Sequence, residues 1–341
     1  MSSTKAVIRD VASHLPAARL TNEDLAAREG AFSAEQIFAK TGIVERPQAA
    51  PDECASDLAA EAARALFAKS GVDPASIDYV IFCTQSPDYF LPASACVLQR
   101  ELGLPTACGA IDINQGCSGY VYGLSLAKGL IESGQVKRLL LLTGDTYTKY
   151  IHPLDRSVCT LFGDGATATL IDAAPDAQGG LGVFQFGTDG RGADKLIVPA
   201  GGFRTPRSSE TAAEATDADG NVRSAENLYM NGRDVFRFAI STVPRSFRAL
   251  LEAAGWTADE VDFLLLHQAN RFMLDELVAR LKFPKEKTPY RFENLGNTVS
   301  STIPFVLEEL LDSGRLKPGA RLALLGFGVG YSWGGCTVEW V

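Results

Sequence analysis

Residues 56–85 read SDLAAEAARALFAKSGVDPASIDYVIFCTQ, and residues 241–268 follow the same plan as STVPRSFRALLEAAGWTADEVDFLLLHQ. Each stretch predicts a helix that ends at a glycine, then a short acidic turn, then a strand of consecutive apolar residues. Aligning Ile77 with Val261 gives an offset of 184 residues (261 − 77 = 184). Strands that are apolar without alternation are typical of sheets covered on both faces. The pair therefore predicts an α/β fold that contains a repeated unit.

Two further matches keep nearly the same offset. Gly116-Cys117 aligns with Gly296-Asn297 at 180 residues (297 − 117 = 180), and Arg138-Leu-Leu-Leu-Leu aligns with Arg321-Leu-Ala-Leu-Leu at 183 (321 − 138 = 183). Chance similarity between two α/β halves would not preserve the spacing. Three ordered matches therefore indicate an internal duplication.

The length of 341 residues agrees with two units, since a domain takes ~150 residues as a soft prior. We expect an N-terminal half, residues 1–175, and a C-terminal half, residues 176–341. Within the second half, residues 201–227 contain almost no large apolar side chains and predict a long surface loop. A loop of this length is either a lid over a binding site or a mobile solvated segment.

Composition excludes several classes of protein. Acidic residues outnumber basic ones by 41 to 32, giving a net charge of −9, whereas nucleic-acid binding requires a basic surface. No secretory signal and no apolar run near the ~20 residues of a membrane span are present, so we expect a soluble, cytoplasmic protein. The seven cysteines follow no disulfide or metal-ligand spacing, and we expect no metal site.

One cysteine has a setting that suits a nucleophile. Cys117 follows a short strand in the turn Asn114-Gln-Gly-Cys117-Ser-Gly-Tyr, directly before an apolar helical stretch. Unpaired N–H groups at a helix N-terminus favour the thiolate, and small neighbours let a substrate approach the sulfur. The alternative is a buried cysteine at a packed turn. We expect the other six cysteines to be buried hydrophobic residues.

Polar residues of the second half could complete a site with this sulfur. His267 ends the apolar strand Leu264-Leu-Leu-His267, and α/β sheets place their sites at such strand ends. Asn297 holds the position that Cys117 holds in the first half. A core histidine and an ordinary turn asparagine are the alternatives. The glycine-rich turn at residues 325–335 could present backbone N–H groups to a carbonyl or simply pack tightly.

With these motifs in order, the chain resembles the β-ketoacyl-acyl-carrier-protein synthase III branch of the thiolase superfamily over essentially its whole length. The motifs that carry the resemblance, besides the Cys117 turn, are Thr41-Gly-Ile43 with Glu45-Arg46, Asp155-Arg156, Phe162-Gly-Asp-Gly-Ala166, Asn231-Gly232, His267-Gln-Ala-Asn270, Gly296-Asn297-Thr298 and the terminal glycine turn. The resemblance implies a thiolase-like five-layered αβαβα fold of two duplicated halves, usually a homodimer.

The resemblance also implies a two-step reaction. Cys117 would take an acyl group from an acyl thioester on coenzyme A or acyl carrier protein (ACP), with the backbone N–H groups of Cys117 and Val329 forming the oxyanion hole. His267 and Asn297 would then stabilise the enolate that decarboxylation of malonyl-ACP produces, and this enolate would attack the acyl-cysteine. Coenzyme A and phosphopantetheine thioesters would be substrates, and no cofactor would be needed.

Binding residues follow from the same resemblance. Lys40, Arg156 and Asn270 would contact the pantetheine carrier and its phosphates, and Leu91 would cross the dimer interface to wall the acyl pocket. An acidic carrier protein would dock on a basic patch. The residues that we expect in this patch are Arg271, Arg280, Lys282, Lys285 and Lys287.

Departures from the family pattern leave the acyl donor open. Gln36 stands where relatives carry an adenine-stacking tryptophan, Lys40 where they carry arginine, and Phe272 where they carry a docking arginine. The donor could therefore be carried on a protein. A specialised condensing enzyme and a catalytically silent partner subunit stay open. A papain-like hydrolase fits poorly, because the nucleophile motif reads Gly-Cys-Ser-Gly-Tyr instead of Cys-Gly-Ser-Cys-Trp.

Overall fold

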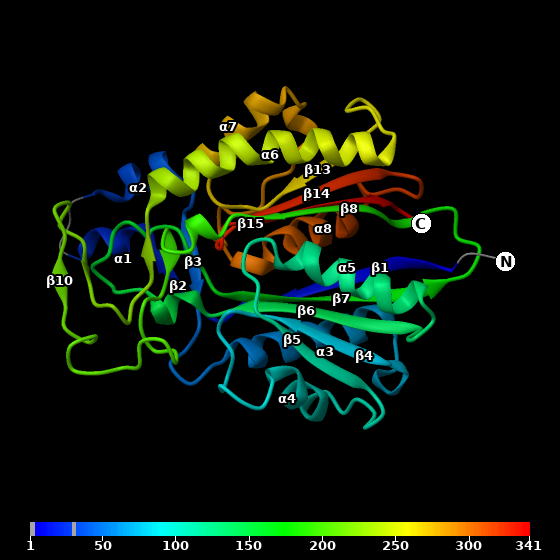
Figure 1. Ribbon diagram of the computed structural model, residues 1–341, viewed down its shortest axis with the longest axis horizontal. Coiled ribbons are helices and arrows are strands. Elements are labelled where there is room, and N and C mark those ends of the chain that lie inside the picture. The colour runs from blue at the N-terminus through cyan, green and yellow to red at the C-terminus, as the bar shows by residue number, and fades with distance from the viewer. Residues whose placement is uncertain (1–3, 29–31) are drawn as a thin grey trace.

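Two β-sheets separated by a layer of helices form the core of the computed structural model, which describes residues 4–28 and 32–341 (Figure 1). The first sheet has the strand order β1-β7-β6-β4-β5 and the second has the order β13-β14-β15-β8. The strands of the first sheet are β1 (Lys5–His14), β4 (Tyr79–Cys83), β5 (Gly109–Ile113), β6 (Arg138–Asp145) and β7 (Gly165–Ala174). Those of the second are β8 (Gly180–Thr188), β13 (Phe263–Leu266), β14 (Arg321–Gly328) and β15 (Ser332–Glu339).

Helices on both sides of each sheet complete five layers (Figure 1). Helices α5 (Gly119–Glu132) and α8 (Thr302–Asp312) lie between the sheets. Helices α3 (Ala55–Ser70) and α4 (Ser94–Glu101) cover the outer face of the first sheet, while α6 (Gly232–Ala254) and α7 (Arg271–Leu281) form the outer layer on the second. The predicted layered α/β arrangement is thus the observed one.

The two quoted stretches fold alike. Each gives a helix, α3 or α6, that ends at a glycine in the left-handed conformation: Gly71 at φ 69° and Gly255 at φ 68°. Glycine suits this position because it has no Cβ to clash there. Each stretch then gives a strand, β4 or β13, that runs parallel to its central neighbour, β6 or β14. The local order predicted from sequence is confirmed in both copies.

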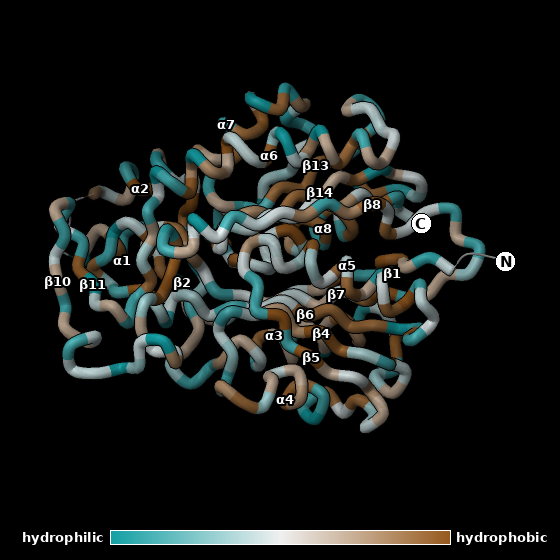
Figure 2. The backbone as a smooth tube through the Cα atoms, viewed as in Figure 1, coloured by the Kyte–Doolittle hydropathy of each residue, from teal (hydrophilic) through white to brown (hydrophobic). Residues whose placement is uncertain are grey.

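The central layer packs apolar side chains against both sheets. Leu124 and Ile131 of α5 and Leu310 of α8 share one buried cluster with residues of β6 and β14. Burying one such side chain stabilises the fold by roughly 1.5–3 kcal/mol. Figure 2 shows hydrophobic residues following the strands and the helices between them. The loops at the strand ends are therefore attached to a well-packed core.

A lobe at one end of the sheets consists of short elements (Figure 1). It contains β2 (Ala18–Thr21), α1 (Asn22–Ala27), α2 (Ala34–Thr41), β3 (Glu45–Gln48), β9 (Leu196–Ile197), β10 (Ala215–Thr216), β11 (Val222–Arg223) and β12 (Tyr229–Met230). Residues 201–227, expected to be a long loop, include the β10–β11 ribbon. Arg223 ties this segment to the buried carboxylate of Asp155 at 3.0 Å, and it also pairs with Asp217 of the same segment at 2.7 Å. These ion pairs explain why a polar segment is ordered here.

Within the part of the chain that the structure describes, no helix has the length and apolar character that crossing a bilayer would require.

Alanine substitutions at two glycines separate the effect of close packing on stability from the effect of helix propensity. A Cβ on Gly326 of β14 would lie 2.7 Å from the carbonyl oxygen of Cys117 and 2.7 Å from the Cα of Ser118. Gly326→Ala should therefore lower the free energy of unfolding by ~1–3 kcal/mol, because backbone atoms have to move. Gly129 of α5 is the matched control, since a Cβ there meets nothing within 4 Å.

Gly129→Ala should raise the free energy of unfolding by ~0.5–1 kcal/mol, through helix propensity alone. Urea unfolding of both variants measures the two effects. Equal stability of Gly326→Ala and the unsubstituted protein would contradict the packing of β14 against the Cys117 turn.

Candidate active site

Cys117 lies in the tight turn between β5 and α5, with 4% of its surface exposed. The end of β14 packs against it so closely that a Cβ on Gly328 would lie 2.6 Å from the Cys117 sulfur. The backbone N–H of Val329 is directed at this sulfur. The geometry thus brings one predicted oxyanion-hole residue to the nucleophile.

The protonation state of Cys117 differs from the expectation. Burial raises the pKa of the thiol to about 12, with a smaller contribution from the charge of Asp145. Loss of hydration outweighs the favourable N–H groups of the turn. The resting side chain is therefore a neutral thiol instead of a thiolate, and its proton has to leave as it reacts.

His267 follows directly after β13 and is fully buried. Burial lowers its pKa to about 3, so the ring is neutral throughout the physiological range. Nδ1 lies 2.7 Å from the hydroxyl oxygen of Thr302, and that hydroxyl is also 3.2 Å from the carbonyl oxygen of Val299. A hydroxyl has one proton to donate. Its choice of acceptor therefore sets which nitrogen of His267 carries the ring proton.

Asn297 is held in place by its own turn. Its side-chain Oδ1 accepts a 2.9 Å hydrogen bond from the Val299 N–H, and its backbone N–H donates to the carbonyl oxygen of Leu161 at 2.8 Å. Because Oδ1 faces a backbone donor, the amide nitrogen Nδ2 is the remaining donor group. No acceptor for Nδ2 is found among residues 4–28 and 32–341.

One cavity of about 1270 Å³ brings the three predicted catalytic residues together. Cys117 from the first half and His267 and Asn297 from the second all line it. The predicted binding residues Lys40, Arg156 and Asn270 line it as well, and so does Arg271, which was predicted as a docking residue. Leu91 does not line it and is 81% exposed on the surface of the chain. A core role for Leu91 within this chain is thereby excluded.

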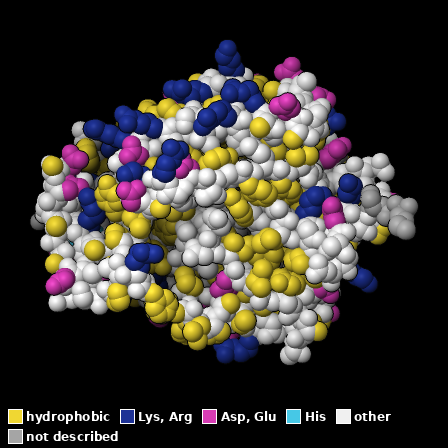
Figure 3. All heavy atoms as spheres, viewed as in Figure 1, with side chains coloured by type: hydrophobic (Ala, Val, Ile, Leu, Met, Phe, Trp, Pro, Cys, Tyr) yellow, Lys and Arg dark blue, Asp and Glu magenta, His cyan; other side chains and the backbone are white. Residues whose placement is uncertain are grey.

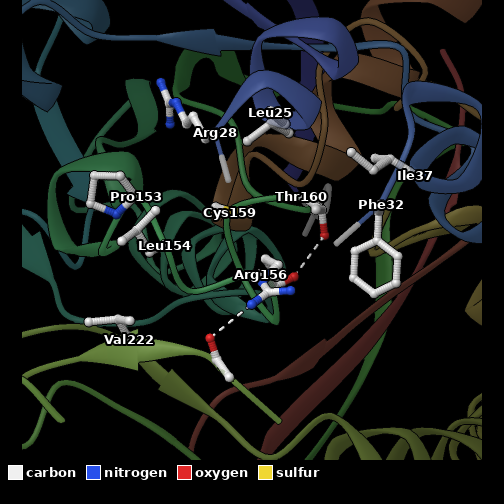
Figure 4. A pocket seen from close by; sticks show the side chains of 11 residues that line it. Leu25, Arg28, Phe32, Ile37, Pro153, Leu154, Arg156, Cys159, Thr160 and Val222 are labelled. Carbon is white, nitrogen blue, oxygen red and sulfur yellow. Dashed lines mark hydrogen bonds between the residues drawn. The ribbon is translucent and has the colours of Figure 1, made fainter. Parts of the chain in front are cut away.

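Arg156 lines both this cavity and a smaller hollow of about 50 Å³, and Figure 4 shows it in the smaller one. Its guanidinium donates to the carbonyl oxygen of Gly220 at 2.9 Å, and its backbone oxygen accepts from the Thr160 hydroxyl at 3.4 Å. Apolar side chains, including Leu25 and Ile37, surround it in the hollow. The arginine is therefore fixed in position at the edge of the cavity.

The predicted docking residues differ from one another in their surroundings. Arg280 forms an ion pair with Glu276 at 2.6 Å, and Lys285 forms one with Asp275 at 2.8 Å. Lys282 is the left-handed residue that ends α7. Acidic neighbours on α7 thus neutralise part of the basic patch that we expected.

Helix α6 carries basic residues that our sequence reading missed. Arg233, Arg237, Arg245 and Arg248 are exposed on it, and Arg233 lines the cavity. Lys and Arg side chains gather along this edge of the molecule in Figure 3. These arginines are spaced four, eight and three residues apart, which places them near one face of a predicted helix, and this spacing could have revealed them in the sequence.

The departures from the family pattern have visible structural roles. Gln36 accepts a 2.9 Å hydrogen bond from the Ser33 N–H and so closes the capping box of α2. Phe272 is 62% exposed and stacks on Phe236, with ring centroids 5.2 Å apart. At this position the cavity rim is therefore aromatic, whereas relatives carry a docking arginine there.

The remaining cysteines follow the expectation only in part. Cys83, Cys159 and Cys336 are buried, Cys54 and Cys108 are half-buried, and Cys96 is exposed, so its predicted burial is wrong. Cys96 lies on α4 at a position that faces solvent. Among the described residues no group of three or more His, Cys, Asp or Glu side chains could hold a metal ion.

Comparisons with known proteins decide the family. A family profile described as 3-oxoacyl-[acyl-carrier-protein (ACP)] synthase III matches residues 111–190, and its C-terminal counterpart matches residues 251–340. A β-ketoacyl-[acyl-carrier-protein] synthase III of Caldanaerobacter subterraneus is 35% identical over 96% of both chains. The chain belongs to the β-ketoacyl-ACP synthase III family.

Solved structures agree with this assignment. A crystal structure titled 3-oxoacyl-(acyl-carrier-protein) synthase III is 57% identical and superposes with a TM-score of 0.97, covering 98% of this chain and 100% of the other. The priming β-ketosynthase from the R1128 polyketide biosynthetic pathway is 29% identical, with a TM-score of 0.85 over 99% and 97% of the two chains. The family resemblance and the thiolase-like fold predicted from sequence are confirmed.

The neutral resting state of Cys117 predicts its reactivity without substrate. Because its pKa is raised to about 12, the thiolate fraction at pH 8 is small and grows with each step in pH up to that value. Alkylation of Cys117 by iodoacetamide, followed by peptide mass spectrometry, should be much slower at pH 8 than alkylation of the exposed Cys96. A Cys117 rate that already levels off below pH 8 would contradict the assigned protonation state.

Proposed function

We propose that this protein is a β-ketoacyl-ACP synthase III-type acyltransferase that condenses an acyl thioester with malonyl-ACP. The observation that carries the proposal is the meeting of Cys117, His267 and Asn297 in one cavity. A nucleophile and two neutral hydrogen-bond groups are the set that a decarboxylative condensation uses. The reaction has two half-reactions that share the cavity.

In the first half-reaction Cys117 takes the acyl group. The sulfur bonds to the thioester carbonyl carbon while the Cys117 and Val329 N–H groups stabilise the oxyanion. The bond to the carrier sulfur then breaks, and the carrier leaves as its thiol. The thiol proton of Cys117 has to be accepted, and neutral His267 offers Nε2 as acceptor while Nδ1 carries the ring proton. The same proton then passes from Nε2 to the departing carrier sulfur, which leaves His267 neutral again.

In the second half-reaction the malonyl thioester carbonyl accepts hydrogen bonds from Asn297 Nδ2 and His267. Loss of CO2 leaves an enolate, whose carbon attacks the acyl-cysteine carbonyl, and the Cys117–acyl bond breaks to release the β-ketoacyl thioester. The departing Cys117 sulfur takes up one proton from solvent, which restores the resting thiol. His267 donates from Nε2 when the Thr302 hydroxyl donates to Nδ1. A neutral ring suits this role, because an imidazolium could protonate the carbanion.

Delivery of both thioesters is assigned to the cavity mouth. Lys40, Arg156, Asn270 and Arg271 are proposed to bind the pantetheine carrier and its phosphates, since all four line the cavity. The guanidinium carbon of Arg271 lies 4.9 Å from the centroid of the Phe38 ring. None of the ion pairs among the described residues joins Arg271 to a carboxylate. An acidic carrier protein would thus meet unpaired cations at the entrance.

The carrier-docking proposal extends from Arg271 to the exposed arginines of α6. Arg233 and Arg237 lie nearest the cavity along this helix, and Arg245 and Arg248 continue the same surface. Arg280, Lys282 and Lys285 stay in the proposal as its outer part, where acidic neighbours reduce the local positive charge. A protein with a net charge of −9 needs such a local patch to attract an acidic partner.

A homodimer is part of the proposal. Tyr89, Phe90 and Leu91 expose 62%, 81% and 81% of their surfaces, and the ring of Phe90 lies 5.7 Å from that of the exposed Phe203. A contiguous apolar surface of this kind favours burial by a partner. Leu91 would then reach the acyl pocket of the second copy. The division into halves 1–175 and 176–341 and a cytoplasmic location belong to the same proposal.

A specialised condensing enzyme is the second candidate. Two departures from the family pattern favour it. Gln36 caps α2 where relatives carry an adenine-stacking tryptophan, and Phe272 stacks on Phe236 where they carry a docking arginine. A silent partner subunit is disfavoured by the complete set of Cys117, His267 and Asn297.

A panel of acyl thioesters tests the proposed function. The protein is incubated with short and medium acyl groups on coenzyme A and on ACP, and intact mass is measured. We expect an acyl adduct with at least one donor, and none in Cys117→Ala. If no donor of either kind labels the protein, the silent-subunit alternative replaces the enzyme. If only ACP-linked donors give an adduct, the acyl donor is carried on a protein and not on coenzyme A.

A further inference from the structure

A buried carboxylate lies beside the catalytic residues at the end of β6. Asp145 is fully buried, and its Oδ1 accepts the Gln85 N–H at 2.8 Å. Its Oδ2 accepts the Ser300 hydroxyl at 2.6 Å and the Ser300 N–H at 3.4 Å. Among the ion pairs of the described chain, none joins Asp145 to a cation, although an unpaired buried carboxylate is costly. The hydrogen bonds that it makes are therefore its compensation.

Ser300 is the centre of the segment that holds the two second-half catalytic groups. We name residues 297–302 the catalytic segment. Within it, the Val299 N–H fixes the side chain of Asn297, and Thr302 contacts His267. Val299 has φ 55°, in the left-handed region that a β-branched residue rarely adopts. Such a conformation persists only where surrounding contacts enforce it.

Contacts from the first half enforce this conformation. Asp145 binds Ser300, and the Thr143 hydroxyl lies 2.8 Å from that of Ser301. The Asp145 contact is the stronger of the two, because hydrogen bonds to a charged or strongly polar carboxyl group are short and roughly twice as strong as neutral ones. Asp145 also accepts the Gln85 N–H, so a single side chain joins the loop after β4 to the catalytic segment.

We propose that Asp145 is a positioning residue, which holds Ser300 and thereby sets Asn297 and His267 in the geometry that condensation requires. This inference rests on the proposed function and assigns a task to a residue that the two half-reactions do not use directly. A misplacement of ~1 Å costs ~10²-fold in rate. Loss of the Asp145–Ser300 contact should therefore slow condensation strongly.

Loss of the Asp145–Ser300 contact should slow condensation without slowing alkylation of Cys117. Condensation depends on the catalytic segment, whereas alkylation of the sulfur does not. The charge of Asp145 opposes ionisation of the nearby Cys117 thiol, so its removal leaves the thiol no less reactive. A merely structural loss would lower condensation only in proportion to the folded fraction, which circular dichroism measures for each variant, while exposure of the buried thiol accelerates its alkylation.

The test compares Asp145→Asn, Ser300→Ala and the double variant in the full chain. Single-turnover condensation of the preformed acyl-enzyme with malonyl-ACP is measured beside iodoacetamide alkylation of Cys117. We expect condensation to fall ~10–100-fold in Asp145→Asn while alkylation stays equal or becomes faster. The double variant should be no slower than Asp145→Asn, because the two side chains act as one contact.

Asp112→Asn is the matched control. Asp112 also lies at a strand of the first sheet and accepts two backbone N–H groups, at 2.6 Å from Ser94 and 2.7 Å from Ala95, but it does not touch the catalytic segment. Its substitution should change stability without changing the ratio of condensation to alkylation. Ser300→Ala keeps the test decisive if Asp145→Asn does not fold.

Three results would overturn the inference. The first is a parallel fall of condensation and alkylation in Asp145→Asn or Ser300→Ala, and the second is an additive loss in the double variant. The third is the same change of ratio in Asp112→Asn. A protein that forms no acyl adduct with any donor would instead refute the proposed function, and with it this inference.

Discussion

The active site depends on the contact between the 297–302 segment of the second half and the strand ends of the first. Asn297 donates its backbone N–H to Leu161 and accepts the Gly163 N–H at 3.1 Å, which forms a short bridge between the halves. Asp145 and Thr143 add side-chain contacts to the same segment. In the proposed site neither half is complete, because one would supply the sulfur and the other both hydrogen-bond groups. Their packing is therefore a condition for the chemistry.

Burial determines the charges in this site more than any neighbouring ion does. It keeps the Cys117 thiol protonated, keeps His267 neutral and raises the pKa of Asp145 to about 7. A neutral imidazole is useful to a condensing enzyme, since it can accept a proton in one half-reaction and donate a hydrogen bond in the other. The Thr302 hydroxyl, shared between His267 and Val299, can follow that change by rotation. The sulfur and the imidazole are therefore both uncharged at rest.

Local patterns predicted the parts of this protein that local physics determines. The glycine-ended helices, the apolar strands β4 and β13 and the turn at Cys117 were readable, because each depends on neighbours in sequence. The duplication gave Asn297 the position in the second half that Cys117 has in the first, and both residues line the cavity. Protonation of Cys117 was not readable, because it depends on the packing of Gly328 and other distant residues around the sulfur.

Contacts between distant segments account for the other differences. Residues 201–227 looked like a free loop because their order comes from the pairing of Arg223 with Asp155. The basic patch after His267 was overestimated, although Glu276 four residues before Arg280 was visible in the sequence. Asp145 was not singled out from the sequence, and its partner Ser300 lies 155 residues away. Nothing in the local sequence of either residue indicates that they meet.

The most direct test of the account is a comparison of the two half-reactions in His267→Ala and Asn297→Ala. Acylation of Cys117 is followed by intact mass, and condensation is followed from the preformed acyl-enzyme. The account predicts that Asn297→Ala forms the acyl adduct at the unsubstituted rate, whereas His267→Ala forms it more slowly, because the thiol proton of Cys117 loses its acceptor. In both variants condensation falls further than acylation, by ~10²-fold or more, because the enolate loses a donor. Condensation that proceeds at the unsubstituted rate in both variants would contradict a site assembled from both halves.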